Sequence, residues 1–247
     1  MPDMILEVCV DDIEGLNAAI TGGADRIELC SALALGGLTP SAALMRKGAA
    51  SSLPCYAMIR PRSGDFVYTA NELSLMRDEI EFAKSCGVAG VVFGANLNDG
   101  SLDLEALAKL SRACGPLPKT LHRCFDLVPD LQAAIEIAIE CGFERILTSG
   151  RAPSANQGIA DIKVATEIAA GRISIMPGAG VNLQTLDNLL QLDVLELHSS
   201  CSTSRFSESA AKSFGFAKED EKRTDAAIVA AMKKRLSDFK GKGIRLS

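Results

Sequence analysis

Short apolar runs alternate with stretches of helical spacing along the whole chain, and this alternation constrains the fold more than any other feature. The apolar runs are rich in Val, Ile and Leu, as buried strands are, and they occupy residues 4–10, 25–30, 55–60, 88–93, 119–125, 144–149, 173–177 and 194–199. The helical spacing predicts helices over residues 12–22, 40–50, 72–86, 103–113, 129–141, 159–170, 182–191 and 219–238. Strands that alternate with helices in this way are expected to be parallel and joined by right-handed crossovers.

Eight such units in 247 residues favour one α/β architecture. A (β/α)8 TIM barrel is typically about 250 residues long. A doubly wound open sheet is the alternative, but its first strand is usually followed by a glycine-rich turn, whereas Val10-Asp11-Asp12 follows here. We therefore predict a single TIM-barrel domain over residues 1–247, with residues 201–247 forming a C-terminal loop and an extra helix.

A short internal repeat agrees with this prediction. Gly23-Ala24-Asp25-Arg26-Ile27 recurs in outline as Gly142-Phe143-Glu144-Arg145-Ile146. The two copies begin the second and the sixth predicted strands, which lie half a barrel apart.

The composition excludes several classes of protein. The formal net charge of −5 argues against a general nucleic-acid binder, which would have an excess of basic residues. No apolar run approaches the roughly 20 residues of a membrane span, and the first four residues do not resemble a secretory signal. The eight cysteines include no Cys-x-x-Cys pair and are spread thinly, as free thiols in a reducing compartment would be. We therefore expect a cytoplasmic protein that binds neither nucleic acid nor a membrane.

Three predicted strands carry the same frame, in which an apolar residue, Glu and another apolar residue precede Cys or His. The three copies are Leu6-Glu7-Val8-Cys9, Ile27-Glu28-Leu29-Cys30 and Leu195-Glu196-Leu197-His198. Because side chains alternate along a strand, each Glu shares a face with the following Cys or His. A lone Glu beside the helix layer would be costly, so we expect all of them to face the barrel interior.

These strands are neighbours once a barrel closes, so their soft ligands are expected to meet at one mouth. Two thiolates and an imidazole suit a soft ion such as Cu(I), and Cys9, Cys30 and His198 are therefore candidate copper(I) ligands. The alternative is that the two cysteines are only apolar filler and the histidine a satisfied polar residue.

Further polar residues follow the ends of other strands. Arg60 follows the third strand and His122 the fifth. With Glu7, Glu28 and Glu196 they could hold an anionic substrate and transfer a proton, which makes all five candidate catalytic residues. The alternative for Arg60 is that it only neutralises Glu7 or Glu28.

Three loops at the same end have the composition of anion-binding turns. Ser149 and Gly150 follow the sixth strand, Gly178 and Gly180 the seventh, and Ser199 lies at the end of the eighth. In TIM barrels the loops after the last two strands often hold phosphate through backbone N–H groups. Tight turns would explain these glycines equally well.

Seven ordered motifs between residues 4 and 200 resemble those of the CutC family of copper homeostasis proteins. They are Glu7-Val8-Cys9, Ala24-Asp25-Arg26-Ile27-Glu28-Leu29-Cys30, Gly36-Gly37-Leu38-Thr39-Pro40-Ser41, Arg60-Pro61-Arg62-Ser63-Gly64-Asp65-Phe66, His122-Arg123-Cys124-Phe125-Asp126, Leu147-Thr148-Ser149-Gly150 and Gly178-Ala179-Gly180-Val181. The chain departs from the family pattern at Ser63 and Cys124, and the match is poor after Ser200. The resemblance implies a TIM barrel, a cytosolic homo-oligomer, and copper(I) binding by Cys9 and Cys30.

The residues and the family resemblance therefore indicate two alternative functions. One is a cytosolic copper(I)-binding protein of copper homeostasis. The other is an enzyme that acts on a small anionic or phosphorylated metabolite at the barrel mouth. A copper site needs two or three soft ligands, whereas the glutamates, the arginine and the glycine-rich loops suit a catalytic pocket better.

Overall fold

The computed structural model describes residues 4–205, 210, 212–215 and 221–241, and the described chain contains one eight-stranded parallel sheet. The strands are β1 (Ile5–Val10), β2 (Arg26–Leu29), β3 (Cys55–Met58), β4 (Gly90–Phe93), β5 (Lys119–Leu121), β6 (Arg145–Thr148), β7 (Ser174–Pro177) and β8 (Glu196–Ser199). Each strand pairs with the next as far as β7, and β8 pairs with β1. β7 and β8 lie side by side, although no ladder of hydrogen bonds joins them in the described chain, so the barrel is nearly closed. The predicted TIM barrel is confirmed.

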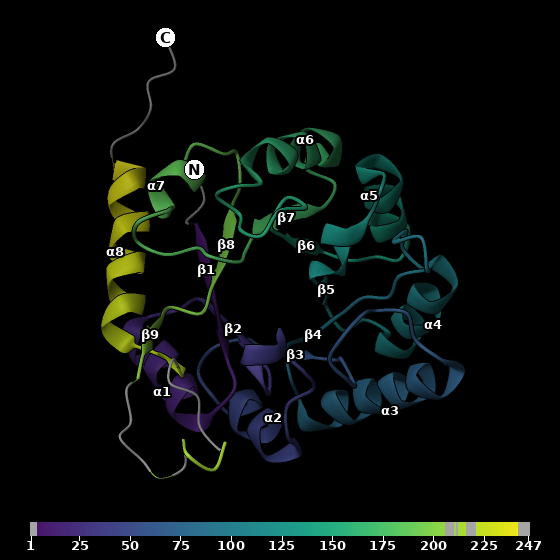
Figure 1. Cartoon of the computed structure of the whole chain (residues 1–247), viewed down its shortest axis with the longest axis horizontal. Helices are drawn as coiled ribbons and strands as arrows, with labels where there is room; N and C mark the ends of the chain where they lie inside the picture. Colours follow the sequence, from purple (N-terminus) through teal and green to yellow (C-terminus); the bar gives the residue numbers. More distant parts are fainter. Residues whose placement is uncertain (1–3, 206–209, 211, 216–220, 242–247) are drawn as a thin grey trace.

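Helices surround the strands as a ring, which Figure 1 shows from α1 to α8. They are α1 (Ile13–Gly22), α2 (Ala42–Ala49), α3 (Ala70–Cys86), α4 (Leu104–Cys114), α5 (Leu131–Glu140), α6 (Ile159–Ala169), α7 (Leu186–Leu189) and α8 (Ala226–Gly241). Side-chain caps begin the first five of them, with Asp12, Ser41, Thr69, Asp103 and Asp130 each accepting a hydrogen bond from a backbone N–H of the first turn.

The helices predicted over 182–191 and 219–238 are shorter in the structure. In the first, the Asn182 side chain accepts from the backbone N–H groups of Gln184 and Thr185, and this local bonding replaces helical bonding until α7 begins. In the second, β10 (Lys222–Thr224) pairs with β9 (Ser202–Ser204), and α8 begins only after Asp225. Residues 219 and 220 of that prediction lie outside the described residues.

The apolar core lies between the strands and the helices, and includes Leu6, Val8, Ile27, Leu29 and Phe93. The other face of the strands carries polar and charged side chains, because successive residues point to opposite faces. Glu7 lies level with Arg26 of β2 and with His198 of β8, and Cys9 lies level with Glu28.

Four buried charges near the amino ends of the strands form the basal ion network, which consists of Arg26, Arg145, Glu7 and Glu196. Arg26 pairs with Glu7 and Glu196, and Arg145 Nε donates to Glu196 Oε2 at 3.0 Å. Both guanidinium groups also pack over the ring of Tyr56, at 5.4 and 5.1 Å from its centroid. Arg26 and Arg145 occupy matching positions of the internal repeat, so the repeat supplies the cations that neutralise two of the glutamates.

Candidate functional site

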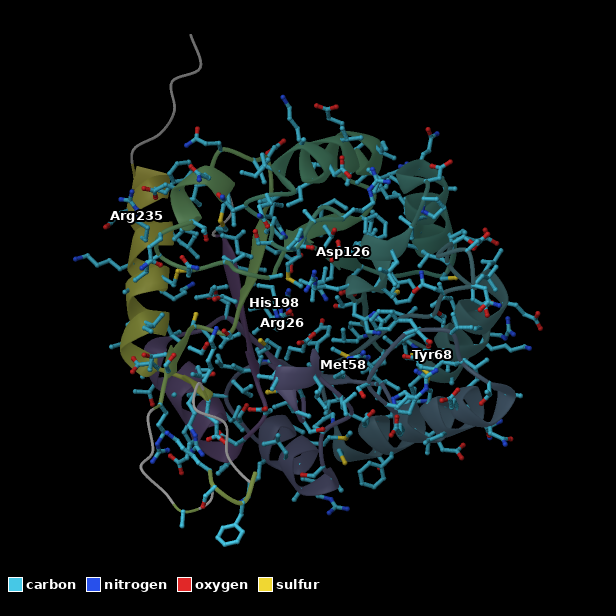
Figure 2. All side chains as sticks on the ribbon, in the orientation of Figure 1. Arg26, Met58, Tyr68, Asp126, His198 and Arg235 are labelled. Carbon is cyan, nitrogen blue, oxygen red and sulfur yellow. The ribbon has the colours of Figure 1, made fainter. Side chains whose placement is uncertain are left out.

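A cavity of about 700 Å³ opens at the carboxyl ends of the strands. Its lining includes Cys9 and Glu28 on β1 and β2, Arg60 and His122 beyond β3 and β5, and His198 on β8. Figure 2 shows His198 near the centre of the barrel, whereas Arg235 lies on the outer helix α8. The described helices include none that is long and apolar enough to cross a membrane.

Cys9, Glu28 and His198 form a buried group whose ligand atoms all lie within 4.8 Å of one another. His198 Nδ1 is 2.7 Å from Glu7 Oε1, and His198 Nε2 is 3.8 Å from Glu28 Oε2. The bond to Glu7 fixes the orientation of the imidazole, as a carboxylate does for many metal-binding histidines. Glu7 therefore connects the basal ion network to this group.

Burial and charge act in opposite directions on the pKa values of these residues. Burial alone would raise the pKa of Glu7, but Arg26 and His198 lower it to about 2, so Glu7 is ionised at neutral pH. Burial disfavours the charged form of His198, but the negative charges that Cys9 and Glu28 can carry raise its pKa well above the usual range. The pKa of Glu28 is raised, chiefly by burial.

Cys30 lies at the edge of this group rather than within it. Its thiol donates to Glu28 Oε2 at 3.4 Å, and it packs among Tyr56, Met58 and Val92. Burial, with the charge of Glu28, raises its pKa well above the usual range.

The stagger of the barrel strands explains why Cys30 lies at this edge. Cys9 of β1 is level with Glu28 of β2, and Glu7 of β1 is level with His198 of β8. The repeated frame is therefore displaced by two residues towards the carboxyl end from β8 to β1 and again from β1 to β2. A Cys of one strand therefore lies beside the Glu of the next rather than beside its Cys.

Arg60 is 5% exposed and is held by backbone carbonyls. Its Nη1 donates to the carbonyl oxygens of Leu35 at 2.9 Å and Gly37 at 3.1 Å, and its Nη2 donates to that of Gly64 at 2.8 Å. In the part of the chain that the structure describes, no carboxylate pairs with this guanidinium, and its Nε has no hydrogen-bond partner. The loops after β2 and β3 therefore orient Arg60, and Arg26, not Arg60, neutralises Glu7.

His122 is 3% exposed. Its Nδ1 accepts a hydrogen bond from the backbone N–H of Cys124 at 3.2 Å. Its Nε2 has no partner among the described residues. Burial and the charge of Arg60 lower its pKa to about 3, so the imidazole is neutral.

Several groups of the predicted anion loops make bonds within the protein. The carboxylate of Asp126 accepts two hydrogen bonds from Ser149, one from the backbone N–H at 2.9 Å and one from the hydroxyl at 2.8 Å. The backbone N–H of Gly150 donates to Thr148 Oγ1 at 2.9 Å, and that of Gly178 donates to the Thr148 carbonyl at 2.9 Å. A carboxylate of the chain itself thus lies against the loop after β6, and the sequence contains no local signal of this contact.

The other loop residues and the third glutamate differ in where they lie. Gly180 and Ser199 line the cavity, and the hydroxyl of Ser199 donates to the Val181 carbonyl at 2.7 Å. Glu196 lies in the basal ion network, bonded to two arginines. The same alternation that identified the glutamates could have identified Arg26, which precedes Glu28 by two residues on the same face.

Strained backbone is concentrated in the loops at this end. Four of the five described non-glycine residues with positive φ follow strands at the cavity, namely Ala32, Arg151, Ala179 and Cys201. Such conformations cost about 1–3 kcal/mol each and cluster at functional sites.

Comparison with known proteins agrees with the resemblance of the motifs. A model of the CutC family matches residues 4–203. A CutC family protein of Rhizobium meliloti is 51% identical over 238 residues, which cover 96% of this chain and 97% of that protein. The copper homeostasis protein cutC homolog of Homo sapiens is 45% identical over 203 residues, covering 81% of this chain and 74% of that protein.

Solved structures agree as well. The crystal structure of a CutC protein from Streptococcus agalactiae matches with a TM-score of 0.76 and 31% identity, over 80% of this chain and 98% of that one. Thiamine phosphate pyrophosphorylase from Pyrococcus furiosus matches with a TM-score of 0.61 over 96% of each chain, but at 12% identity it shares only the fold. The chain belongs to the CutC family.

Proposed function

We propose that this protein binds copper(I) at the carboxyl end of its barrel and that it serves copper homeostasis. The observation that carries the proposal is the buried group of Cys9, Glu28 and His198, with His198 oriented by Glu7. A thiolate sulfur and an imidazole nitrogen are ligands that Cu(I) prefers, and an oriented histidine binds metal more tightly than a free one.

Cys9 and His198 are the two principal ligands in this proposal. The bond between His198 Nδ1 and Glu7 leaves Nε2 as the coordinating atom, on the side where Cys9 and Glu28 lie. Cys30 serves as a third ligand, because release of its bond to Glu28 frees its sulfur beside the same group. Metal binding displaces the protons of these groups, since only a thiolate and a neutral imidazole nitrogen coordinate.

The setting of the site fits this role. All eight cysteines lie in the described chain and are free thiols, as they would be in the reducing cytoplasm. We further propose that the protein acts there and, as the family resemblance implies, as a homo-oligomer. The Homo sapiens relative carries copper homeostasis in its name.

An anaerobic titration with Cu(I), in competition with a chromophoric chelator, tests the proposal. Cys9→Ser and His198→Gln should each weaken binding by about 10-fold or more, because each removes one of two principal ligands. Cys30→Ser should weaken it less, and the double variant of Cys9 and Cys30 should abolish tight binding.

Cys114→Ser is the matched control, because Cys114 is also a buried thiol but ends helix α4, away from the cavity. It should bind copper as the parent does. If Cys9→Ser binds as tightly as Cys114→Ser, the copper site is elsewhere. X-ray absorption of the loaded protein should detect both sulfur and nitrogen around the metal.

A further inference from the structure

The cavity contains a second chemical feature that copper binding does not use, which is the positive charge of Arg60, paired with no carboxylate of the described residues. Its guanidinium is buried, and its three bonds go to the carbonyl oxygens of Leu35, Gly37 and Gly64. Carbonyl oxygens orient the group but do not neutralise its charge. A buried charge without a counter-charge is costly, so proteins normally pair it or use it to bind a ligand.

The donors that remain on Arg60 can bind a planar anion. The two bonds of Nη1 occupy both of its hydrogens, and Nη2 uses one of its two. Nε has no partner among the described residues. Nε–H and the second hydrogen of Nη2 therefore remain. The hydroxyl of Tyr68 also interacts with this guanidinium, and a carboxylate that displaces it can take both hydrogens in the two parallel bonds that guanidinium makes with a carboxylate.

His122 supplies a neutral donor from the same lining. Because its Nδ1 accepts from the backbone N–H of Cys124, the ring hydrogen is on Nε2. Nε2 is buried and has no partner in the described chain, although His122 lines the cavity. A buried N–H without an acceptor is rare in proteins and calls for a ligand atom.

Phe66 packs against both Arg60 and His122, so the three side chains form one wall of the cavity. Its ring lies 4.8 Å from Arg60 Cζ and 4.8 Å, centroid to centroid, from the ring of His122. All three residues line the cavity. An anion at this wall would therefore meet two buried donors beside an apolar surface that strengthens their electrostatic attraction.

We propose that Arg60, His122 and Phe66 form a binding site for the carboxylate of a small organic anion. Arg60 donates from Nε and Nη2 to the carboxylate oxygens, and His122 donates from Nε2 to a carboxylate oxygen or to an oxygen on the neighbouring carbon. The apolar part of the ligand packs on Phe66. This site does not depend on copper binding, since it uses neither Cys9 nor His198.

Charge favours a carboxylate over a phosphate. The wall offers one unit of positive charge, because His122 is neutral, and this balances a monoanion. A phosphate monoester carries close to two negative charges near neutral pH. The carboxylate of Asp126, which accepts the hydrogen bonds of Ser149, lines the same cavity, and its negative charge also disfavours a doubly charged ligand.

Calorimetric titration of the metal-free full-length protein with lactate, acetate and inorganic phosphate tests this proposal. Lactate or acetate should bind to the parent protein in the millimolar range or more tightly, and phosphate should bind more weakly. Arg60→Met should weaken carboxylate binding by about 10- to 100-fold, because it removes charge-assisted hydrogen bonds. His122→Phe should weaken it by a smaller factor, since it removes one neutral donor.

Arg62→Met is the matched control, because Arg62 belongs to the same loop but pairs with Asp65 and Glu72 near the surface. It should leave carboxylate affinity unchanged. If Arg60→Met does not fold, Arg60→Lys keeps the charge, loses the two-bond geometry and should still weaken binding about 10-fold.

Three results would overturn the proposal: neither carboxylate binds, carboxylate binding survives the loss of Arg60, or phosphate binds more tightly than both carboxylates. Loss of carboxylate binding in Arg60→Met with copper affinity retained would separate this site from the copper site.

Discussion

The two ends of the barrel interior contain the same types of charged residue, but they differ in how fully these residues are paired. In the basal ion network, Arg26 and Arg145 pair with Glu7 and Glu196, and each of these charges has an opposite charge beside it. At the cavity, Arg60 pairs with no described carboxylate, and Glu28 Oε1, Arg60 Nε and His122 Nε2 have no partner in the described chain. Since nearly all buried polar atoms in proteins are paired, the basal end has the pairing that stabilises a fold, and the cavity end has the free donors that our proposals assign to ligand binding.

Glu7 links the two ends of the barrel interior. One of its oxygens pairs with Arg26 in the basal ion network, and the other bonds to His198 beside the cavity. The network therefore fixes the orientation of His198, the histidine that we propose as a copper ligand, and rigid support of this kind is what a preorganised site requires.

The largest effect is expected from breaking the basal ion network. Arg26→Met should lower the free energy of unfolding by about 3–5 kcal/mol, because it leaves the buried Glu7 without its guanidinium partner and Glu196 with Arg145 alone. Urea denaturation measures this change. Arg172→Met removes an exposed pair with Glu136 and should cost about 1 kcal/mol or less. Equal losses in the two variants would mean that the network is no more stabilising than a surface ion pair.

The second prediction uses the buried neutral imidazole of His122. Its pKa is about 3 in the folded protein and 6.5 when unperturbed, so below 6.5 the unfolded chain binds a proton that the folded chain does not. The free energy of unfolding should therefore fall as the pH drops below 6.5, by about 1.4 kcal/mol per pH unit from this group.

Comparison of the parent with His122→Phe isolates this contribution, and the variant should have the shallower pH dependence. Arg60→Met should also flatten the dependence, because Arg60 lowers the pKa of His122. The lowered pKa of Glu7 contributes only below 4.5, and the raised pKa of Glu28 acts in parent and variant alike, so the difference between the two proteins from pH 6.5 to 4.5 reports on His122. A parallel dependence in parent and His122→Phe would show that the imidazole is not buried as described.

The barrel could be predicted from the sequence because its signals are local. Each strand is a short apolar run, and each of the first five helices has a capping residue. The interior position of Glu7 and Glu28 followed from the two-residue period of a strand, which needs no knowledge of partners. The boundaries were wrong where side chains bond to nearby backbone, as at Asn182, because such turns compete with helix formation.

The partners within the site could not be predicted in the same way. They depend on the stagger between strands, which places Cys9 beside Glu28 instead of Cys30. They also depend on contacts between distant loops, such as the bonds between Asp126 and Ser149. The sequence identified several polar residues of the cavity, among them Cys9, Glu28 and His198, but only the register shows which of them face one another.

Gly90, which begins β4, and Gly94, which follows its last residue, allow the two ends to be disturbed separately. A Cβ atom on Gly90 would lie 2.2 Å from Tyr56 Cε1, and one on Gly94 would lie 2.8 Å from His122 Nδ1 and 2.3 Å from Cys124 Sγ. Each alanine variant should lose about 1–3 kcal/mol of stability through overpacking. Only Gly94→Ala should also weaken lactate binding, because it displaces His122. Loss of lactate binding in Gly90→Ala alone would contradict the division between the two ends.

An effect on stability as small as that of Arg172→Met is expected from Arg60→Met, although the same type of residue is removed as in Arg26→Met. No described carboxylate depends on Arg60, so its loss leaves no buried charge behind. The variant loses the hydrogen bonds to Leu35, Gly37 and Gly64, but it also loses the cost of burying a guanidinium, and the two contributions oppose each other. We expect a change within about 1 kcal/mol by urea denaturation. A loss as large as that of Arg26→Met would mean that Arg60 supports the fold, and the contrast between the two ends of the barrel would then disappear.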